Sequence, residues 1–328
     1  MQAIVLVGGE GTRLRPLTDT VPKPALTLVD RPFLAYMVEW LGGHRVTEVV
    51  LACGFLPDRL REALGEKEHE GVALTYVDEP EPRGTAGAIR FAAEALGERL
   101  EDRFLALNGD VLTDLDLTAL LRAHKERGAR ATIGLYGVED AAAFGLVECD
   151  AEGAVRSFTE KTGVAAPGEV NAGAYVLERS VLDLIPRDRK VSIETEVFPL
   201  MIGDGLWATA LEGYWKDIGT QERYLEATWD ILEGRVATRV LATAPGLFVG
   251  EGCAVAGSAV IGPRAVVSKG CVIGADAAVV GSVLLDGCTV GDGARINGSV
   301  LAAGAVVEPG ARVDDEMVAE NERVAAAR

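Results

Sequence analysis

The sequence predicts an α/β protein in two parts. Residues 1–235 are expected to form a Rossmann-like, doubly wound domain, because apolar runs of strand length alternate there with helix-like segments. Residues 236–328 are expected to form a parallel β-helix, because aliphatic residues recur there every six positions. A length of 328 residues, of which 48% are apolar, is enough to build two buried cores.

The first part contains four apolar runs of strand length with helical patterns between them. Strands are expected at Ala3–Val7, Val49–Cys53, Leu74–Val77 and Phe104–Leu107. Helices are expected at Phe33–Leu41, Asp58–Leu64, Thr85–Leu96 and, closing the domain, Gln221–Leu232. Such an alternation predicts a parallel sheet covered on both faces. Ligands of these folds bind beyond the carboxyl ends of the strands, where two motifs fall, Gly8-Gly9-Glu10-Gly11 and Asn108-Gly109-Asp110.

The second part repeats a six-residue pattern with one large and one small inward position. The large position is held by Val249, Val255, Ile261, Val267, Ile273, Val279 and Leu285, and after two one-residue slips by Val290, Ile296, Leu301, Val307 and Val313. From Val255 onward a compact residue stands two positions before each, and Cys253, Cys271 and Cys288 are among these. Because each coil buries its aliphatic residue against the next, the three cysteines are expected to fill the core.

Charge and composition exclude several classes of function. A net charge of −18 argues against a nucleic-acid partner, since phosphate backbones require a basic surface. No apolar stretch is long enough to span a membrane, and the first strand has no basic leader, so a cytoplasmic protein is expected. Five cysteines without a CxxC pair indicate reduced, structural thiols. The histidines, His44, His69 and His124, are expected at the surface.

The strongest local motif runs from Gly8 to Thr18 and is followed by Pro22-Lys23-Pro24. Its glycines allow backbone N–H groups to converge on phosphate oxygens. Arg13 would add a guanidinium fork and Lys23 a point charge, which are the two complementary ways of binding phosphate. The motif matches neither the P-loop nor the dinucleotide-binding pattern. The sequence therefore predicts a phosphate site of another type.

Taken as a whole, the motif from Gly8 to Pro24 resembles the signature motif of the sugar-phosphate nucleotidyltransferases, which are also called nucleotide-sugar pyrophosphorylases. The resemblance extends along the chain. Asn108-Gly109-Asp110 resembles the family's metal-binding aspartate motif, Trp215-Lys216-Asp217-Ile218-Gly219-Thr220 resembles its second metal motif, and Glu160-Lys161 and Val170-Asn171-Ala172-Gly173 resemble its sugar-pocket motifs. Gly145 matches a family position where the backbone touches the sugar. The resemblance also implies that the C-terminal β-helix is left-handed.

The resemblance implies that a sugar 1-phosphate attacks the α-phosphorus of a nucleoside triphosphate and that pyrophosphate leaves. No covalent protein nucleophile or general base is needed, so catalysis consists of positioning and charge neutralisation. The catalytic residues would be Arg13 and Lys23, on the phosphates, and Asp110 and Asp217, on Mg²⁺. The nucleotide would be bound by Leu6, Gly8, Gly9, Gly11, Thr12, Arg13, Glu79 and Gly84, and the sugar phosphate by Gly145, Glu160, Lys161 and Asn171.

The segment 78–87 resembles the family's base-reading loop. Its Glu79 stands where thymidylyl-transferring relatives carry glutamine. An ionised carboxylate only accepts hydrogen bonds, which suits the adjacent N1–H and 2-amino donors of guanine and not the O4 of thymine. GTP and mannose 1-phosphate, giving GDP-mannose, are therefore the expected substrates. The serious alternative is a glucose-1-phosphate thymidylyltransferase, because Arg83, where relatives often carry leucine, and Lys216 depart from the guanylyltransferase pattern.

Two other functions fit parts of the sequence. Hexapeptide β-helices often carry acyltransferase activity, but such enzymes rely on a histidine base, and no histidine follows His124. A regulatory relative that only binds nucleotide sugars would be expected to lose metal or phosphate groups. Here Arg13, Lys23, Asp110 and Asp217 are all present. The faces and edges of the β-helix are expected to mediate assembly into a homo-oligomer.

Overall fold

The computed structural model describes residues 1–142, 144–159, 163, 166–187 and 189–326. The chain forms two compact units. The first combines Met1–Gly9 with Met37–Trp215, and the second combines Glu10–Tyr36 with Lys216–Arg328. Each unit has a hydrophobic core of its own, one around the central sheet and one inside the β-helix.

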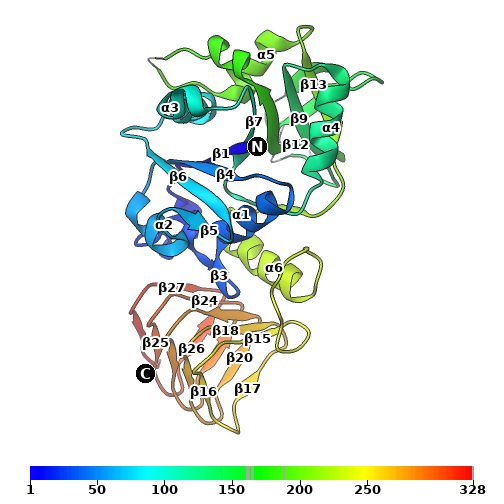
Figure 1. The fold of residues 1–328 in the computed structure, drawn as a ribbon. Coiled ribbons are helices and arrows are strands. Elements are labelled where there is room, and N and C mark those ends of the chain that lie inside the picture. The colour runs from blue at the N-terminus through cyan, green and yellow to red at the C-terminus, as the bar shows by residue number, and fades with distance from the viewer. Residues whose placement is uncertain (143, 160–162, 164–165, 188, 327–328) are drawn as a thin grey trace. The chain divides into compact units, whose positions relative to one another are not determined.

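A mixed sheet forms the centre of the first unit. Its parallel part runs in the order β7-β1-β4-β6, with β1 at Gln2–Val7, β4 at Glu48–Cys53, β6 at Val72–Asp78 and β7 at Arg103–Asn108. The four predicted strands are therefore confirmed. Helix α3 (Gly84–Leu96) covers one face of these strands and α2 (Pro57–Leu64) covers the other (Figure 1), as predicted for a doubly wound arrangement.

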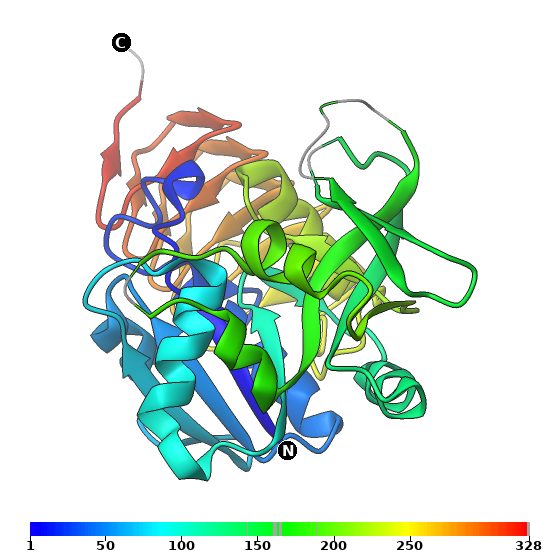
Figure 2. The same ribbon diagram turned by 90° about the horizontal axis from the view of Figure 1, so that it is seen from above.

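Most of the other half of the sheet is antiparallel, which the sequence did not predict, although β13 (Leu206–Ala210) pairs parallel with β9 (Ala131–Val138). Strand β12 (Gly168–Glu178) pairs antiparallel with β9 on one side and with β10 and β7, one after the other along its length, on the opposite side. Figure 2 shows this antiparallel half beside the parallel strands that lie under α3. The remaining elements of this half are β10 (Leu146–Cys149), β11 (Val155–Thr159), α4 (Leu117–Arg127), α5 (Phe198–Met201), η4 (Arg179–Leu184) and η5 (Ile193–Val197).

One sequence expectation is wrong in the first unit. His124 was expected at the surface, but its side chain is fully buried. Helix α4 packs against β9 and β12, and this contact places His124 Nδ1 2.8 Å from Thr132 Oγ1 and Nε2 3.1 Å from Glu178 Oε1. The polar neighbours satisfy both ring nitrogens, which is what permits burial of the imidazole.

The second unit joins the motif segment near the N-terminus to the C-terminal part of the chain. Helix α6 (Gln221–Leu232), predicted from the sequence, begins at the cap residue Thr220, whose hydroxyl accepts from Arg223 N. Two hydrogen bonds tie this unit together: Gln221 Nε2 donates to Gly298 O at 3.0 Å, and Thr20 Oγ1 donates to Glu320 Oε2 at 2.8 Å. The short elements of the motif segment are η1 (Thr12–Leu14), η2 (Lys23–Ala25), β2 (Thr27–Leu28) and β3 (Arg31–Pro32).

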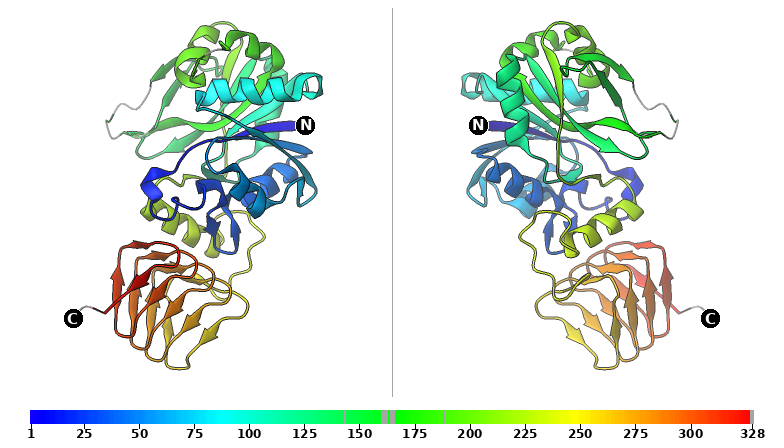
Figure 3. Two further views of the ribbon diagram at one scale, coloured as in Figure 1. Left: turned by 90° about the vertical axis from the view of Figure 1, so that its left-hand side faces the viewer. Right: turned by 90° about the vertical axis from the view of Figure 1, so that its right-hand side faces the viewer.

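The C-terminal part is a left-handed parallel β-helix whose coils stack on one another (Figure 3). Its three sheets contain, in order, β15 (Leu247–Val249), β18 (Ala265–Val267), β21 (Ser282–Leu284), β24 (Val300–Leu301) and β27 (Met317–Val318); β16 (Ala254–Val255), β19 (Val272–Ile273), β22 (Thr289–Val290), β25 (Val306–Val307) and β28 (Arg323–Val324); and β17 (Val260–Ile261), β20 (Ala278–Val280), β23 (Arg295–Asn297) and β26 (Arg312–Asp314).

The predicted inward positions form the core of the β-helix. From Val267 to Val313 the expected aliphatic and compact positions are buried in the core, except at β21. There the expectation is wrong by one residue. Leu284, which pairs with Val267 and Leu301, takes the large position in place of Leu285, and Ser282, which pairs with Ala265, takes the compact position in place of Val283. Cys271 and Cys288 are fully buried in it, while Cys253 in the first coil is half-buried and packs against it. The five cysteines of the chain are free thiols. None of the described helices has the length and apolar character needed to cross a membrane.

Candidate functional site

The predicted ligand residues of the first unit lie where four parallel strands end. Val7 pairs with Cys53, Cys53 with Asp78, and Leu6 with Asn108. The residues that follow these strand ends are therefore brought to one edge of the sheet, as expected for the ligand-binding edge of such folds. These are Gly8 and Gly9 after β1, Gly54 after β4, Glu79 after β6 and Gly109-Asp110 after β7.

Two glycines at this edge are required by close backbone packing. A Cβ on Gly109 would lie 2.6 Å from Val7 Cγ1 and 2.7 Å from Leu6 O, which also accepts the Gly109 N–H at 2.9 Å. A Cβ on Gly54 would lie 2.9 Å from Gly8 O. Gly54 was not identified from the sequence, because a single glycine after a strand gives no specific signal.

Glu79 lies against the glycine turn. The position of a Cβ on Gly8 is 3.6 Å from Glu79 Oε1, and Glu79 Oε2 accepts the backbone N–H of Arg83 at 3.3 Å. Burial raises the pKa of the Glu79 carboxyl, and the Arg83 N–H and guanidinium oppose that rise. The Arg83 guanidinium itself stacks over Phe91, 4.5 Å from the ring centroid. Arg83 therefore supports Glu79 through a backbone group that any non-proline residue would provide.

Asn108 and Asp110 flank Gly109 at the end of β7. Asp110 is half-exposed. Asn108 Oδ1 is buried and, within the described part of the chain, has no hydrogen-bond partner. Buried acceptors are rarely left unsatisfied, and this one stands beside the predicted metal ligand Asp110. Sequence reasoning assigned no role to Asn108, since an asparagine before glycine is usually a turn residue.

A magnesium ion is compatible with these donors. Each unit contains one predicted metal ligand, Asp110 in the first and Asp217 in the second, and the Asn108 amide oxygen stands beside Asp110 in the chain. Among the described residues no three His, Cys, Asp or Glu side chains form a cluster able to enclose a metal. Mg²⁺ is commonly held by only one or two carboxylates, with substrate phosphates and water completing its octahedron. Each of the two carboxylates is therefore of a type that suits Mg²⁺ bound with a substrate.

The predicted sugar-site residues Gly145 and Asn171 are joined directly. The backbone N–H of Asn171 donates to Gly145 O at 3.1 Å, across the start of β10 and β12. The Asn171 side chain accepts from Gly173 N at 3.0 Å and donates to the Tyr175 hydroxyl at 2.7 Å. These bonds fix the orientation of the amide. Glu160 and Lys161, predicted for the same site, lie outside the described residues.

A chain of hydrogen bonds extends from Asn171 through Tyr175 and holds its side chain in place. The Tyr175 hydroxyl donates onward to Glu194 Oε1 at 3.4 Å, and Glu194 Oε2 accepts from Thr85 Oγ1 at 2.8 Å in the first turn of α3. Burial, together with the nearby Glu194 and Asp110 charges, raises the pKa of Tyr175 well above its ordinary value. Tyr175 therefore remains a neutral hydroxyl. The predicted Gly84 begins the same helix.

In the second unit, the predicted Arg13, Lys23 and Asp217 are brought together. Gly11 adopts a left-handed conformation with φ 64° and leads into the turn Thr12–Leu14. Lys23 is 7% exposed, and its Nζ lies 3.8 Å from Asp217 Oδ1. A Cβ on Gly219 would lie 2.6 Å from Arg13 Nη2 and 3.0 Å from Asp217 Oδ2. The Arg13 and Lys23 cations and the Asp217 carboxylate therefore lie close together. A side chain at position 219 would collide with Arg13 and Asp217, so glycine is required there.

Arg223 is a further member of this group that sequence reasoning missed. Its Nη1 donates to Asp217 Oδ2 at 2.8 Å from the first turn of α6. Lys216, which departs from the guanylyltransferase pattern, pairs instead with Asp230 at 2.8 Å and Glu226 at 3.0 Å. Lys216 thus anchors β14 (Trp215–Asp217) to α6, and its identity is explained by these contacts.

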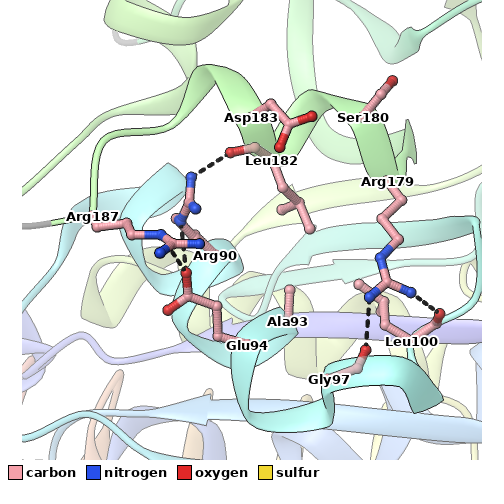
Figure 4. A pocket seen from close by; sticks show the side chains of 10 residues that line it. All are labelled: Arg90, Ala93, Glu94, Gly97, Leu100, Arg179, Ser180, Leu182, Asp183 and Arg187. Atoms are coloured by element: carbon pink, nitrogen blue, oxygen red, sulfur yellow. Dashed lines mark hydrogen bonds and ion pairs between the residues drawn. The ribbon is translucent and has the colours of Figure 1, made fainter.

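A hollow of about 620 Å³ lies elsewhere in the first unit, at the end of α3 (Figure 4). Three of its charged residues, Arg90, Arg179 and Arg187, make bonds within the protein. Arg179 donates to Gly97 O and Leu100 O, both at 3.0 Å, and Arg90 donates to Leu182 O at 2.6 Å. Satisfying backbone carbonyls at a helix end is a structural role. None of the predicted site residues that the structure describes lines this hollow.

Comparison with known proteins gives a consistent result over nearly the whole chain. Residues 2–234 match the model of the nucleotidyl transferase family, and residues 243–326 match a GMPPB C-terminal domain. A mannose-1-phosphate guanylyltransferase from Mycobacterium tuberculosis is 37% identical over 87% of this chain and 80% of its own length. A probable mannose-1-phosphate guanylyltransferase 3 from rice, Oryza sativa subsp. japonica, is 36% identical over 87% of this chain and 78% of its own length.

A solved structure shares the fold of the catalytic part. The crystal structure of HddC from Yersinia pseudotuberculosis complexed with GMP-PN superposes with a TM-score of 0.61 and 26% identity. The superposition covers 70% of this chain and 99% of that protein.

Proposed function

Since this chain belongs to the nucleotidyl transferase family, we propose that it transfers GMP from GTP to mannose 1-phosphate, forming GDP-mannose and pyrophosphate. The curated relatives that match most of its length are named mannose-1-phosphate guanylyltransferases. The observation that carries the choice of GTP is the Glu79 carboxylate, which lies against the glycine turn at the ligand edge of the sheet.

Glu79 recognises the base in this proposal. Its carboxylate accepts from the N1–H and 2-amino groups of guanine, two adjacent donors that thymine and uracil lack. The Arg83 backbone N–H already occupies part of Oε2 and holds the side chain in place. Leu6 and Gly84 complete the nucleotide site. Leu6 lies next to the last residue of strand β1, and Gly84 is the first residue of helix α3.

The glycine turn and two cations bind the phosphates. Gly8 and Gly9 are exposed and carry no side chain, so their N–H groups are accessible to phosphate oxygens, and Gly11 and Thr12 continue the turn. Arg13 stabilises the negative charge that develops on the departing pyrophosphate. Lys23 is buried beside Asp217 and contributes a positive charge. Because the side chain has little contact with water, its electrostatic attraction to the phosphates is stronger than at an exposed position.

Asp110 and Asp217 are the proposed ligands of Mg²⁺. When bound, the ion neutralises phosphate charge and holds the triphosphate in the geometry for in-line attack. Arg223 keeps the Asp217 carboxylate in one orientation through its 2.8 Å ion pair. The Asn108 amide oxygen accepts a hydrogen bond from a group at this site, which satisfies its otherwise unpaired acceptor.

The mannose 1-phosphate is bound by Gly145, Asn171, Glu160 and Lys161. Support for the first two comes from their mutual hydrogen bond, which presents the Gly145 segment and the Asn171 amide to one ligand. Glu160 accepts from sugar hydroxyls and Lys161 binds the sugar phosphate. The phosphate oxygen of the sugar attacks the α-phosphorus of GTP, the bond to the pyrophosphate oxygen breaks, and the protein forms no covalent bond.

The test is a substrate panel with purified protein and Mg²⁺. Pyrophosphate release is measured for GTP, dTTP, UTP and ATP, each combined with mannose 1-phosphate or glucose 1-phosphate. The proposal expects GTP with mannose 1-phosphate to give the highest kcat/KM. A clear preference for dTTP with glucose 1-phosphate would replace it with the thymidylyltransferase, and binding of GDP-mannose without turnover of any pair would indicate a regulatory protein.

A further inference from the structure

Glu194 lies between two segments to which the proposed function assigns different substrates. It is half-buried in η5, which packs against helix α3. Its Oε2 atom accepts from Thr85 Oγ1 at 2.8 Å, one residue after Gly84 of the nucleotide site. Its Oε1 atom accepts from the Tyr175 hydroxyl at 3.4 Å, and Tyr175 in turn accepts from Asn171 of the sugar site. One carboxylate is therefore bonded toward both segments.

Backbone hydrogen bonds fix the segment that carries Glu194 to the first turn of α3. Val191 O accepts the Ala86 N–H at 3.0 Å, which satisfies one of the donors that a helix leaves free at its start. Ile193 N donates to Thr85 Oγ1 at 2.8 Å. The Thr85 hydroxyl can accept this bond and still donate its single proton to Glu194. The position of the carboxylate is therefore set by the start of α3.

Glu194 also sets the direction of the hydrogen bonds that lead to Asn171. An ionised carboxylate only accepts, so the single proton of the Tyr175 hydroxyl is directed to it. The Tyr175 oxygen is then left as an acceptor, and Asn171 Nδ2 donates to it at 2.7 Å. The amide oxygen of Asn171 accepts from Gly173 N at 3.0 Å. Turning the amide over would lose both bonds, because two donors would meet at Gly173 and two acceptors at Tyr175.

The fixed amide determines what Asn171 offers to a ligand. An amide has two N–H donors and an oxygen with two lone pairs, so one donor and one acceptor position remain for sugar hydroxyls. Tyr175 is fully buried, and burial raises its pKa well above the ordinary value, so the hydroxyl between Glu194 and Asn171 stays protonated. A site built from a donor and an acceptor in fixed places rejects a sugar whose hydroxyls do not match them.

We propose that Glu194 is a positioning residue for the sugar phosphate. Through Tyr175 it keeps the Asn171 amide in the orientation that binds sugar hydroxyls. Through Thr85 it keeps this amide in a fixed place relative to the start of α3, where the nucleotide binds. The inference rests on the proposed function, because it takes Asn171 and Gly84 as substrate-binding residues, but it does not depend on which base or which sugar is bound.

Glu194→Gln tests the proposal with almost no change in side-chain size. Two hydroxyls donate to Oε2, those of Thr85 at 2.8 Å and Ser192 at 2.7 Å, whereas only Tyr175 donates to Oε1 among the described residues. The glutamine oxygen is therefore expected to keep the Oε2 position, and its NH₂ group then meets Tyr175 as a donor instead of an acceptor. The substitution breaks the bond on the sugar side and keeps those on the nucleotide side.

Isothermal titration calorimetry with Mg²⁺ compares GDP-mannose with GDP, which lacks the sugar. In Glu194→Gln the affinity for GDP-mannose should fall about tenfold, while the affinity for GDP should stay within about twofold of the wild-type value. Tyr175→Phe interrupts the same hydrogen bonds and should give the same split. The double variant should lose no more than the larger of the two single losses, because both residues act through one chain of contacts.

The matched control is Glu196→Gln. Glu196 is a carboxylate of the same element η5, but it accepts from Ser192 N at 3.0 Å and pairs with Arg189. This variant should bind GDP-mannose and GDP as the wild-type protein does, and circular dichroism should show every variant folded at the temperature of the titration. An equal loss of affinity for GDP and GDP-mannose in Glu194→Gln, or no loss of either, would overturn the inference. The same split in Glu196→Gln would also overturn it.

Failure of the proposed function gives a different result. The wild-type protein would then bind a nucleotide sugar other than GDP-mannose. The titrations are in that case run with this nucleotide sugar and its nucleoside diphosphate, and Glu194→Gln must show the same split between them. A wild-type protein that binds no nucleotide sugar would overturn both the proposed function and the role of Glu194.

Discussion

Replacing Glu79 by glutamine tests base recognition without changing the size of the side chain. Glutamine keeps one acceptor but presents an NH₂ group where the carboxylate had its second oxygen. Glu79 is half-buried, and among the described residues one of its oxygens, Oε2, accepts a hydrogen bond, from Arg83 N. The other is available to the base. The substitution therefore exchanges one charge-assisted hydrogen bond to guanine for a donor–donor contact.

The size of the effect follows from the energy of that bond. A hydrogen bond to a charged group contributes about 1.5–3 kcal/mol, so kcat/KM for GTP should fall roughly 10- to 150-fold. The value for dTTP should hold or rise, because an amide matches the O4 and N3–H of thymine. Pyrophosphate release with both nucleotides gives the ratio directly. Glu81→Gln is the control, since Glu81 lies two residues along the same loop with a side chain that is 76% exposed.

An unchanged ratio of GTP to dTTP in Glu79→Gln would refute this role for Glu79. An equal loss in Glu81→Gln would show that the loop responds to charge in general and not to a contact with the base.

Three other perturbations test separate parts of the structure. Asp110→Asn should lower turnover by roughly 10²-fold or more, because a metal-binding charge is lost. The thermal midpoint of unfolding should stay near the wild-type value. Near-normal activity of the variant at saturating Mg²⁺ would show that Asp110 does not bind the metal. Gly109→Ala forces a Cβ against Val7 and Leu6 and should lower the free energy of unfolding, measured in urea, by about 1–3 kcal/mol. The control is Gly137→Ala, which should change the free energy of unfolding little because the space around its Cβ position is open. Burial lowers the pKa of His124 below its ordinary 6.5, so the unfolded chain takes up a proton first and the free energy of unfolding should fall as the pH drops below 6.5. A His124→Gln variant with the same pH dependence would contradict this.

The parallel half of the sheet and the β-helix were predictable because their signals are local. Each strand from β1 to β7 in the parallel half is a short apolar run next to a helical pattern, and each coil repeats the same inward residues. The antiparallel half was not, because β12 takes its partners β7 and β9 from distant parts of the chain. A strand's own sequence does not specify which edge it joins.

The candidate site divides in the same way. Glycines, Arg13, Lys23 and the two aspartates stand in contiguous motifs and were identified from them. Arg223 and Gly54 gain their roles from neighbours that the fold supplies, which are Asp217 at the end of β14 and the backbone oxygen of Gly8. The role of Asn108 depends on the burial of its amide oxygen, which has no hydrogen-bond partner among the described residues. His124 shows the same limit, since its burial depends on Thr132 and Glu178 across the α4 contact.

The most direct measurement is the identity of the products. Purified protein is incubated with GTP, mannose 1-phosphate and Mg²⁺, and the reaction is followed by phosphorus NMR with mass spectrometry of the nucleotide product. The proposed function requires GDP-mannose and pyrophosphate in equal amounts, with no reaction when mannose 1-phosphate is left out. Formation of GDP and orthophosphate, or of no new nucleotide at all, would contradict it.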